Sequence, residues 1–257
     1  MENKRKKTAL ITGAAKGIGH QIAISMAEAG YNIVINYRSD EDAANRLCKT
    51  VKSMGVEAVT LYADISNIKD IREMYRQAFE IFPVLDVVVN NAGISSEVNF
   101  LDATEEMFDQ MTAIDWKGLF FSSQIAARHM VEHKVKGTII NLSSNQIDGC
   151  WPRATIYAPT KAAVSKFTKN AAMELSHYGI RMAAIAPGYT DVGWEPDDIR
   201  MQAAARLPFK RFATTKEVAE GVVYLASDAA AYITGTTLVM DGGATLPVVA
   251  ANDFVED

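Results

Sequence analysis

Short apolar runs alternate with longer amphipathic stretches along most of the chain, and this alternation predicts its secondary structure. Residues 87–89 are all valine, and such continuous apolar runs are typical of strands buried on both faces of a parallel sheet. We expect strands at residues 8–12, 32–36, 58–62, 85–90, 137–142, 181–186 and 237–240. Helical patterns lie between them, near residues 17–29, 40–54, 67–80, 104–133, 155–178 and 215–227.

Strands and helices that alternate in this way indicate βαβ units, and therefore an α/β fold with a doubly wound parallel sheet in three α/β/α layers. About seven strands are expected. No linker rich in Pro, Gly or Ser and no internal repeat interrupts the pattern, so residues 1–257 are expected to form a single domain. The segment 188–211 is irregular and contains Pro196 and Pro208, which favours a substrate lid there.

The composition excludes several classes of protein. Apolar residues make up 49% of the 257 positions and charged residues 22%, which is typical of a globular protein with a substantial core. Two distant cysteines, Cys48 and Cys150, exclude a disulfide framework. The net charge of −5 argues against nucleic acid as a partner, and the basic cluster at residues 4–7 is expected to be a solvated leader. With no signal peptide and no apolar run of about 18 residues, we expect a cytoplasmic protein without membrane contact.

A glycine-rich turn follows the first predicted strand and opens the first predicted helix. Residues 12–19 read Thr-Gly-Ala-Ala-Lys-Gly-Ile-Gly. Glycine allows the tight turn and the close approach of a pyrophosphate, and the helix N-terminus offers unpaired N–H groups to that anion. Three nearby glycines could also serve only as a tight connection, but their place in the first βα turn favours a dinucleotide site of the Rossmann type.

The spacing Gly-x-x-x-Gly-x-Gly after Thr12 resembles the coenzyme motif of the short-chain dehydrogenase/reductase family. Further marks of that family follow in order through residue 243: Asn90-Asn91-Ala92-Gly93, Ser144 thirteen residues before Tyr157, Tyr157-x-x-x-Lys161, Pro187-Gly188 and Asp241-Gly242-Gly243. The resemblance implies an NAD(P)-dependent dehydrogenase or reductase that acts on CH–OH groups. It also implies a homodimer or homotetramer, with the helices at 104–133 and 155–178 at the interface.

The end of the second strand bears on the choice of nicotinamide cofactor. An acidic residue there would bind the adenosine ribose and repel a 2′-phosphate, but this chain has Asn36, followed by Arg38. Arg38 and Lys16 therefore favour NADP(H), whereas pairing of Arg38 with a nearby carboxylate would leave NAD possible. By the resemblance, the cofactor-binding residues are Thr12, Gly13, Lys16, Gly17, Ile18, Gly19, Arg38, Ser39, Asp64, Ile65, Asn91, Ala92, Gly93, Tyr157, Lys161, Pro187, Gly188 and Thr190.

The candidate catalytic residues are Ser144, Tyr157, Lys161 and Asp115. A phenol with an ordinary pKa of about 10 is a poor base near pH 7, so a nearby cation has to favour its ionised form. Tyr157 and Lys161 lie four positions apart, on one face of a helix. The resemblance implies that Tyr157 transfers the proton and that Ser144 donates a hydrogen bond to the substrate. It implies that Lys161 lowers the pKa of Tyr157 and binds the ribose. Asp115 occupies the position where the family has Asn, and its carboxylate would add negative charge near Lys161.

The expected substrate residues are Ser144, Asn145, Trp151, Tyr157 and Trp194. Aromatic rings beside amides suit a polyhydroxylated ligand, although Trp151 and Trp194 could equally serve only in packing. Within the family the chain most resembles bacterial glucose 1-dehydrogenases, which favours a sugar or polyol and a product ketone or lactone. The tail at 244–257 is longer than is typical of 3-oxoacyl carrier-protein reductases, whose substrates stay an alternative.

Two further alternatives stay open. One is a hydroxysteroid substrate, and the other is a nucleotide-binding scaffold that has lost turnover through Asp115. A His-x-x-Glu-His run at 129–133 has the spelling of a zinc motif, but no third ligand is apparent, so we expect no metal.

Overall fold

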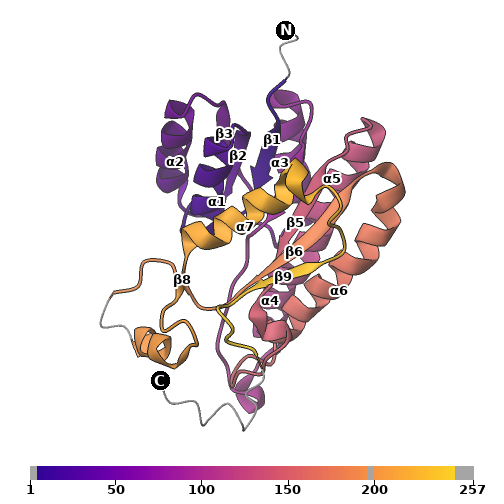
Figure 1. Cartoon of the computed structure of the whole chain (residues 1–257). Helices are drawn as coiled ribbons and strands as arrows, with labels where there is room; N and C mark the ends of the chain where they lie inside the picture. The colour runs from indigo at the N-terminus through magenta and orange to yellow at the C-terminus, as the bar shows by residue number, and fades with distance from the viewer. Residues whose placement is uncertain (1–4, 196–198, 247–257) are drawn as a thin grey trace.

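Seven parallel strands form one sheet with helices on both faces, as the alternating pattern predicts (Figure 1). This computed structural model describes residues 5–195 and 199–246. The spatial order β3-β2-β1-β4-β5-β6-β9 reverses direction between β1 and β4, which is the feature of a doubly wound sheet. The strands are β1 (Thr8–Ile11), β2 (Asn32–Tyr37), β3 (Ala58–Tyr62), β4 (Val87–Asn90), β5 (Thr138–Leu142), β6 (Arg181–Pro187) and β9 (Thr237–Met240).

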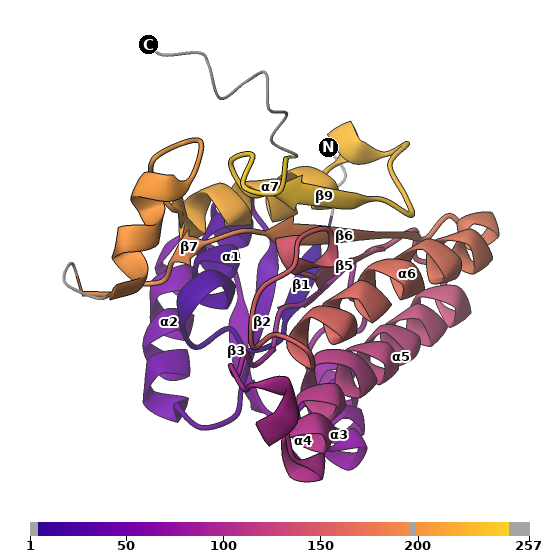
Figure 2. The same ribbon diagram turned by 90° about the horizontal axis from the view of Figure 1, so that it is seen from below.

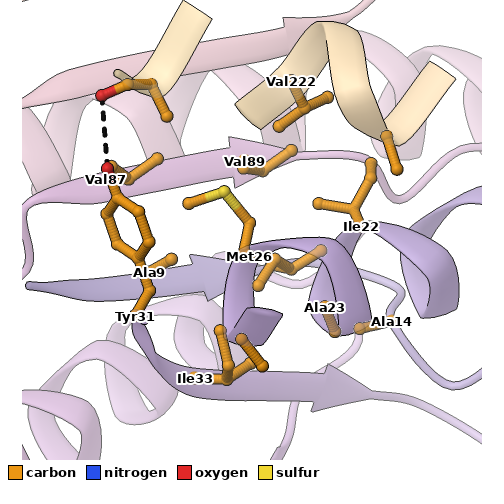
Figure 3. Packing of buried hydrophobic residues seen from close by; sticks show 14 of the residues in the cluster. Ala9, Ala14, Ile22, Ala23, Met26, Tyr31, Ile33, Val87, Val89 and Val222 are labelled. Carbon is orange, nitrogen blue, oxygen red and sulfur yellow. Dashed lines mark hydrogen bonds between the residues drawn. The ribbon is translucent and has the colours of Figure 1, made fainter. Parts of the chain in front are cut away.

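Each face of the sheet is covered by its own layer of helices (Figure 2). One layer contains α1 (Gly17–Glu28), α2 (Glu41–Ser53) and α7 (Thr215–Ala226), and the other contains α3 (Ile68–Ile81), α5 (Leu119–Glu132) and α6 (Tyr157–Leu175). On the first face Ile22 and Met26 of α1 pack among Val89 and Val222 (Figure 3). Tyr31 closes this core, and its hydroxyl donates a hydrogen bond to the carbonyl oxygen of Ala226 at 3.4 Å (Figure 3).

The predicted element boundaries agree with the structure to within a few residues because their signals are local. At the start of α2, for example, the Asp40 carboxylate accepts a hydrogen bond from the backbone N–H of Ala43 at 2.8 Å. Such a cap satisfies an N–H group that the helix itself cannot pair. None of the helices within the described ranges is long and apolar enough to cross a membrane.

The helix predicted at 104–133 is present, but it contains a π-helical turn that the sequence did not indicate. The structure has α4 (Glu105–Thr112), a π-helical segment (Ala113–Gly118) and then α5. At Gly118 an added Cβ would overlap the carbonyl oxygen of Ile65, so the helix here lies directly against the backbone that follows β3. A π-helical turn shifts the hydrogen-bond register of a helix and often occurs at functional sites, and this one contains Asp115.

The 188–211 segment contains a short regular element that the sequence did not predict. β7 (Thr190–Asp191) pairs in parallel with β8 (Ala213–Thr214) in a separate two-stranded sheet. Strands of two residues are too short to show an alternation of apolar and polar residues in the sequence. A 3₁₀ segment (Ile199–Arg206) lies between them. Pro196, with 197 and 198, lies outside the described residues, as does most of the tail, 247–257.

The described basic residues at the N-terminus are exposed, as expected of a solvated segment, but their side chains are also tied to the fold. Arg5 donates two hydrogen bonds to the Asp86 carboxylate, at 2.9 and 2.7 Å. Lys6 donates to the carbonyl oxygen of Gly55, and Lys7 pairs with Asp228. These partners are far away in the sequence, which is why the local charge pattern did not reveal them. Lys4 lies outside the described residues.

Candidate functional site

A pocket of about 480 Å³ lies where the polypeptide leaves the carboxyl ends of β4, β5 and β6. Ligands of doubly wound folds bind at this edge of the sheet. The pocket brings together twelve of the residues singled out from the sequence: Ile18, Asn91, Gly93, Ser144, Asn145, Trp151, Tyr157, Lys161, Pro187, Gly188, Thr190 and Trp194. Its other lining residues are Ile94, Ser95, Leu142, Ser143, Gln146, Tyr189 and Val192.

Tyr157 and Lys161 lie in the same pocket as Ser144 because hydrogen bonds connect the end of β5 to the first turns of α6. The Ser143 hydroxyl donates a hydrogen bond to the carbonyl oxygen of Lys161 at 2.9 Å, and it lies 2.9 Å from the hydroxyl of Ser165. The Lys161 Nζ lies 5.5 Å from the centre of the Tyr157 ring. The Ser144 Oγ accepts a hydrogen bond from the backbone N–H of Gln146 at 3.3 Å, which leaves its own hydrogen for another acceptor.

Asp115 lies behind the pocket, next to Lys161. Its side chain is fully buried, and Oδ1 accepts a hydrogen bond from the backbone N–H of Ile94 at 2.8 Å. Oδ2 lies 3.8 Å from Lys161 Nζ and has no hydrogen-bond partner among the described residues. Burial raises the pKa of the Asp115 carboxyl, and the Lys161 ammonium partly opposes this shift.

Lys161 is itself almost completely buried, and its ammonium donates a hydrogen bond to the carbonyl oxygen of Leu142 at 3.2 Å. A buried ammonium needs partners of this kind, since burial without them disfavours the charged form. The Cβ of a residue larger than glycine at Gly93 would lie 3.2 Å from Asp115 Oδ1 and 3.3 Å from Lys161 Nζ. Gly93 therefore lets the chain after β4 pass close to the buried pair.

The glycine loop is held in place by side chains from the neighbouring strands. The backbone N–H of Gly13 donates to Asn36 Oδ1 at 3.0 Å, and Asn91 Nδ2 donates to the carbonyl oxygen of Thr12 at 2.9 Å. The Thr12 hydroxyl in turn accepts from the backbone N–H groups of Asn91 and Ala92. A Cβ on Gly13, which has φ +64°, would lie 3.0 Å from the Cα of Ala92.

This loop fits a pyrophosphate on two grounds. Gly17 (φ +58°) and Gly19 let the loop turn closely, and a Cβ on Gly19 would overlap the Asn91 side chain. Lys16 is the N-cap of α1 and makes no side-chain capping bond, so the first N–H groups of that helix have no side-chain partner there. Unpaired N–H groups and the positive end of a helix dipole together favour an anion.

Lys16 and Arg38 are both exposed, and neither forms an ion pair within the part of the chain that the structure describes. The alternative that Arg38 pairs with Asp40 is not observed among the described residues, and the Asp40 carboxylate caps α2. The neutral residue Asn36, next to the last residue of β2, is buried, and its amide nitrogen donates to the carbonyl oxygens of Leu61 and Ala63. Ser39 is exposed next to Arg38.

Asp64 and Ile65, two of the expected cofactor-binding residues, do not line the pocket with Tyr157. Asp64 uses its carboxylate to accept hydrogen bonds from the backbone N–H and the hydroxyl of Ser66, at 2.8 and 2.7 Å. Ile65 is buried against Gly118. Both residues lie just after β3, beside the end of β2 that leads to Arg38.

Several residues of the pocket were not singled out as binding residues from the sequence. Ile94 and Ser95 follow directly after the Asn-Ala-Gly segment, so their position in the motif could have identified them. The amide oxygen of Gln146 is buried and has no hydrogen-bond partner in the described residues. Val192 lies over the glycine loop, 3.8 Å from where a Cβ on Gly17 would stand, and Thr190 donates to the carbonyl oxygen of Gly188.

The histidines of the zinc-like run have other partners. His129 is buried, its Nε2 lies 2.9 Å from the carbonyl oxygen of Pro83, and its ring stacks between Phe79 and His133. Burial lowers the pKa of His129. Within the described residues no three His, Cys, Asp or Glu side chains are grouped so that they could hold a metal ion.

Comparisons with known proteins extend over nearly the whole chain. A family model described as Enoyl-(Acyl carrier protein) reductase matches residues 13–245. The 3-oxoacyl-[acyl-carrier-protein] reductase of Staphylococcus epidermidis is 37% identical over 242 residues, which cover 92% of this chain and 98% of that protein. Glucose 1-dehydrogenase 2 of Bacillus subtilis is 34% identical over 252 residues, 93% and 95% of the two chains. The crystal structure of acetoin dehydrogenase from Salmonella typhimurium superposes with a TM-score of 0.86 at 33% identity and covers 94% of this chain and 98% of its own.

Proposed function

Because this chain belongs to the short-chain dehydrogenase/reductase family of oxidoreductases, we propose that it interconverts a secondary alcohol and a ketone or lactone with NADP(H). The observation that carries the proposal is one pocket lined by Ser144, Tyr157 and Lys161, at the edge of the sheet to which the glycine loop belongs. An intact set of these three side chains argues against a scaffold without turnover.

The residues around the glycine loop suit a nicotinamide dinucleotide. Gly13 and Gly19 let the loop pack closely against Ala92 and Asn91, and the N-terminus of α1 lies directly behind it. Arg38 and Lys16 would hold a 2′-phosphate, since a guanidinium can donate two hydrogen bonds to it. When bound, the dinucleotide supplies or accepts the hydride of the reaction.

In ketone reduction, the phenol of Tyr157 donates its proton to the substrate oxygen, and the Ser144 hydroxyl donates a hydrogen bond to the same atom. Both groups act where negative charge develops, which is where a donor lowers the barrier most. The Lys161 ammonium stabilises the phenolate that remains on Tyr157. In the direction of alcohol oxidation, the phenolate takes the proton back.

The substrate is proposed to carry a second oxygen beside the reacting carbon, as a sugar, polyol or hydroxyketone does. Asn145 and Gln146 follow Ser144 directly, and the buried amide oxygen of Gln146 has no partner among the described residues. A substrate hydroxyl that donated to this oxygen would remove the cost of burying it unpaired. Relatives named as glucose and acetoin dehydrogenases are in keeping with such a substrate. The 3-oxoacyl thioesters stay the second candidate, on the strength of the relative named for them.

The test is an absorbance screen at 340 nm with purified protein. NADP⁺ and NAD⁺ are each combined with aldoses, polyols, hydroxyketones, hydroxysteroids and 3-hydroxyacyl thioesters, and the reduced cofactors with the matching ketones. Rates confined to oxygen-substituted substrates would support the proposal. Rates confined to thioesters or steroids would replace the substrate class, and bound cofactor without any rate would contradict enzymatic function.

Replacing Asp115 with asparagine is expected to shift the pH profile of alcohol oxidation to lower pH. The buried carboxylate lies 3.8 Å from Lys161 Nζ, and its negative charge favours the protonated state of the site. Removal of this negative charge should move the rising limb of the plot of kcat against pH to lower pH by about one pH unit. The measurement is kcat from pH 5 to 11 for wild type and Asp115→Asn, with Asp109→Asn, an exposed carboxylate on α4, as the matched control. An unmoved profile would show that the carboxylate does not influence the proton transfer.

We also propose that the chain associates with itself through α5 and α6. A groove of about 560 Å³ runs between these helices, and Trp116, Phe120 and Phe167 contact one another at its edge. By the family resemblance this face joins two copies, so light scattering should give a particle of two or four chains. A monomer at micromolar concentration would contradict the proposal.

A further inference from the structure

The two walls of the pocket are joined by one hydrogen bond between aromatic side chains. One wall follows β5 and includes Trp151, and the other follows β6 and includes Tyr189. The indole Nε1–H of Trp151 donates to the hydroxyl oxygen of Tyr189 at 3.1 Å. Both residues line the pocket that contains Ser144 and Tyr157.

Tyr189 belongs to the 188–211 segment and is supported by Phe212, the residue that follows this segment. The Tyr189 ring stacks on Phe212, with ring centres 5.3 Å apart and 14° between the planes. Trp194 meets the same Phe212 edge-on, at 5.4 Å and 82°. Phe212 is buried, and it immediately precedes β8 of the small sheet. The tyrosine is therefore supported by a packed aromatic cluster.

The Trp151 side is held by its own segment. A Cβ on Gly149 would lie 2.5 Å from Cζ3 of the Trp151 ring, so the indole lies directly against the backbone of that glycine. Two residues farther on, Arg153 pairs with Glu97 at 2.7 Å, and its carbonyl oxygen accepts from the backbone N–H of Val98. Contacts with the segment after β4 thus fix the position of this wall as well.

We propose that Trp151 and Tyr189 form a latch across the pocket that restricts the substrate to compact ketones and alcohols and disfavours long acyl chains. The inference rests on the proposed function, and it concerns the length of the substrate and not the chemistry at its carbonyl. The pocket of about 480 Å³ lies in the lower half of the range for ligand sites, and its lining includes residues expected to bind the cofactor, which leaves less room for the substrate. A chain that extends beyond the aromatic wall has to separate Trp151 from Tyr189, which costs their hydrogen bond and disturbs the stacking on Phe212.

The kinetic test compares two diketones with the same reacting group, 2,3-butanedione and 2,3-heptanedione, with NADPH. Wild type is expected to prefer the shorter by at least about tenfold in kcat/KM, in line with the limits of discrimination by a hydrophobic wall. Trp151→Phe and Tyr189→Phe should each reduce this preference by about fivefold, the equivalent of one neutral hydrogen bond. The double variant should go no further than either single one, because both remove the same bond.

Tyr232→Phe, which removes the hydroxyl of a fully exposed tyrosine, is the matched control for Tyr189→Phe and should keep the wild-type preference. An unchanged preference in both latch variants, or no preference in wild type, would overturn the proposal. Failure of every protein, wild type included, to reduce either diketone would also overturn the proposal, because it would exclude compact ketones as substrates; the sugar and polyol class is tested separately by the absorbance screen.

A second measurement observes the latch without turnover. The chain has three tryptophans, so ¹⁵N-labelled protein gives three indole N–H signals, and Trp151→Phe identifies one of them by its loss. Tyr189→Phe should shift that signal and speed its exchange with solvent, because the indole loses its acceptor. A signal unaffected by Tyr189→Phe would show that the hydrogen bond does not exist in solution.

Discussion

Replacing Tyr157 with phenylalanine is expected to abolish turnover while leaving the cofactor in place. General acid–base transfer by a positioned side chain contributes about 10²–10⁴-fold, and we expect a loss of about 10³-fold or more in kcat. The ring of Tyr157 stays in its position over Lys161, so only the hydroxyl is removed. The measurements are kcat on the substrate found in the screen and the Kd of NADPH from its fluorescence.

The control for this substitution is a tyrosine outside the pocket. Tyr232 is fully exposed, and Tyr232→Phe should leave both kcat and the Kd unchanged. A Tyr157→Phe enzyme that kept a third of its rate would exclude Tyr157 as the acid. A similar loss in both rate and NADPH affinity would indicate a role in binding and not in proton transfer.

The fold could be predicted almost completely because its signals are local. Continuous apolar runs gave the strands, and capping residues such as Asp40 gave the helix starts. The breaks in the prediction have causes far away in the sequence. In the π-helical turn around Asp115, Gly118 lies against the backbone of Ile65, and Arg5 is bound by Asp86. No window of neighbouring residues contains either pair.

The residues of the candidate site could be predicted to a similar degree. The buried polar side chains that hold them in place could not. The resemblance to the family's motifs pointed to Ser144, Tyr157 and Lys161, and the structure places these three residues in the lining of one pocket. The side chains that hold this pocket together are polar groups whose partners lie on other elements. Asn90 is an example, since its amide donates to Asn141 and Ser123 and accepts from Ser122, all within the buried interior. In the sequence such a residue looks the same as a surface asparagine.

The latch likewise combines residues that the sequence reveals with a contact that it does not. The sequence pointed to Trp151 as a substrate residue and to the loop that contains Tyr189 as a pocket wall, but it did not predict the contact between these two side chains. Two aromatic residues in different loops have no periodic relation, and their contact depends on how the 188–211 segment returns across the sheet. Specificity is therefore the property for which the sequence was least informative and the structure adds most.

Replacing Arg38 with aspartate is expected to reverse the preference between the two nicotinamide cofactors. Arg38 is exposed at the end of β2 and has no ion pair within the described residues, so its guanidinium is free to meet a 2′-phosphate. The variant loses a charge-assisted contact and places a negative charge near the phosphate. NADPH binding should therefore weaken by about 100-fold or more in Kd, or about 3 kcal/mol of binding free energy. NADH lacks that phosphate, and an acidic residue at this end of the strand suits its ribose hydroxyls, so its Kd should fall or change by less than about threefold.

The comparison requires a control for net charge, since the substitution makes the whole protein more acidic by two units. Arg72→Asp serves this purpose, because Arg72 is an exposed residue of α3 on the opposite face of the sheet. It should change both Kd values by less than about twofold at 0.15 M salt, where distant charges are screened. Titration of NADPH and NADH fluorescence with the three proteins gives the ratio of affinities directly. Equal weakening of both cofactors by Arg38→Asp would mean that Arg38 contacts no 2′-phosphate, and NAD(H) would then become the expected cofactor.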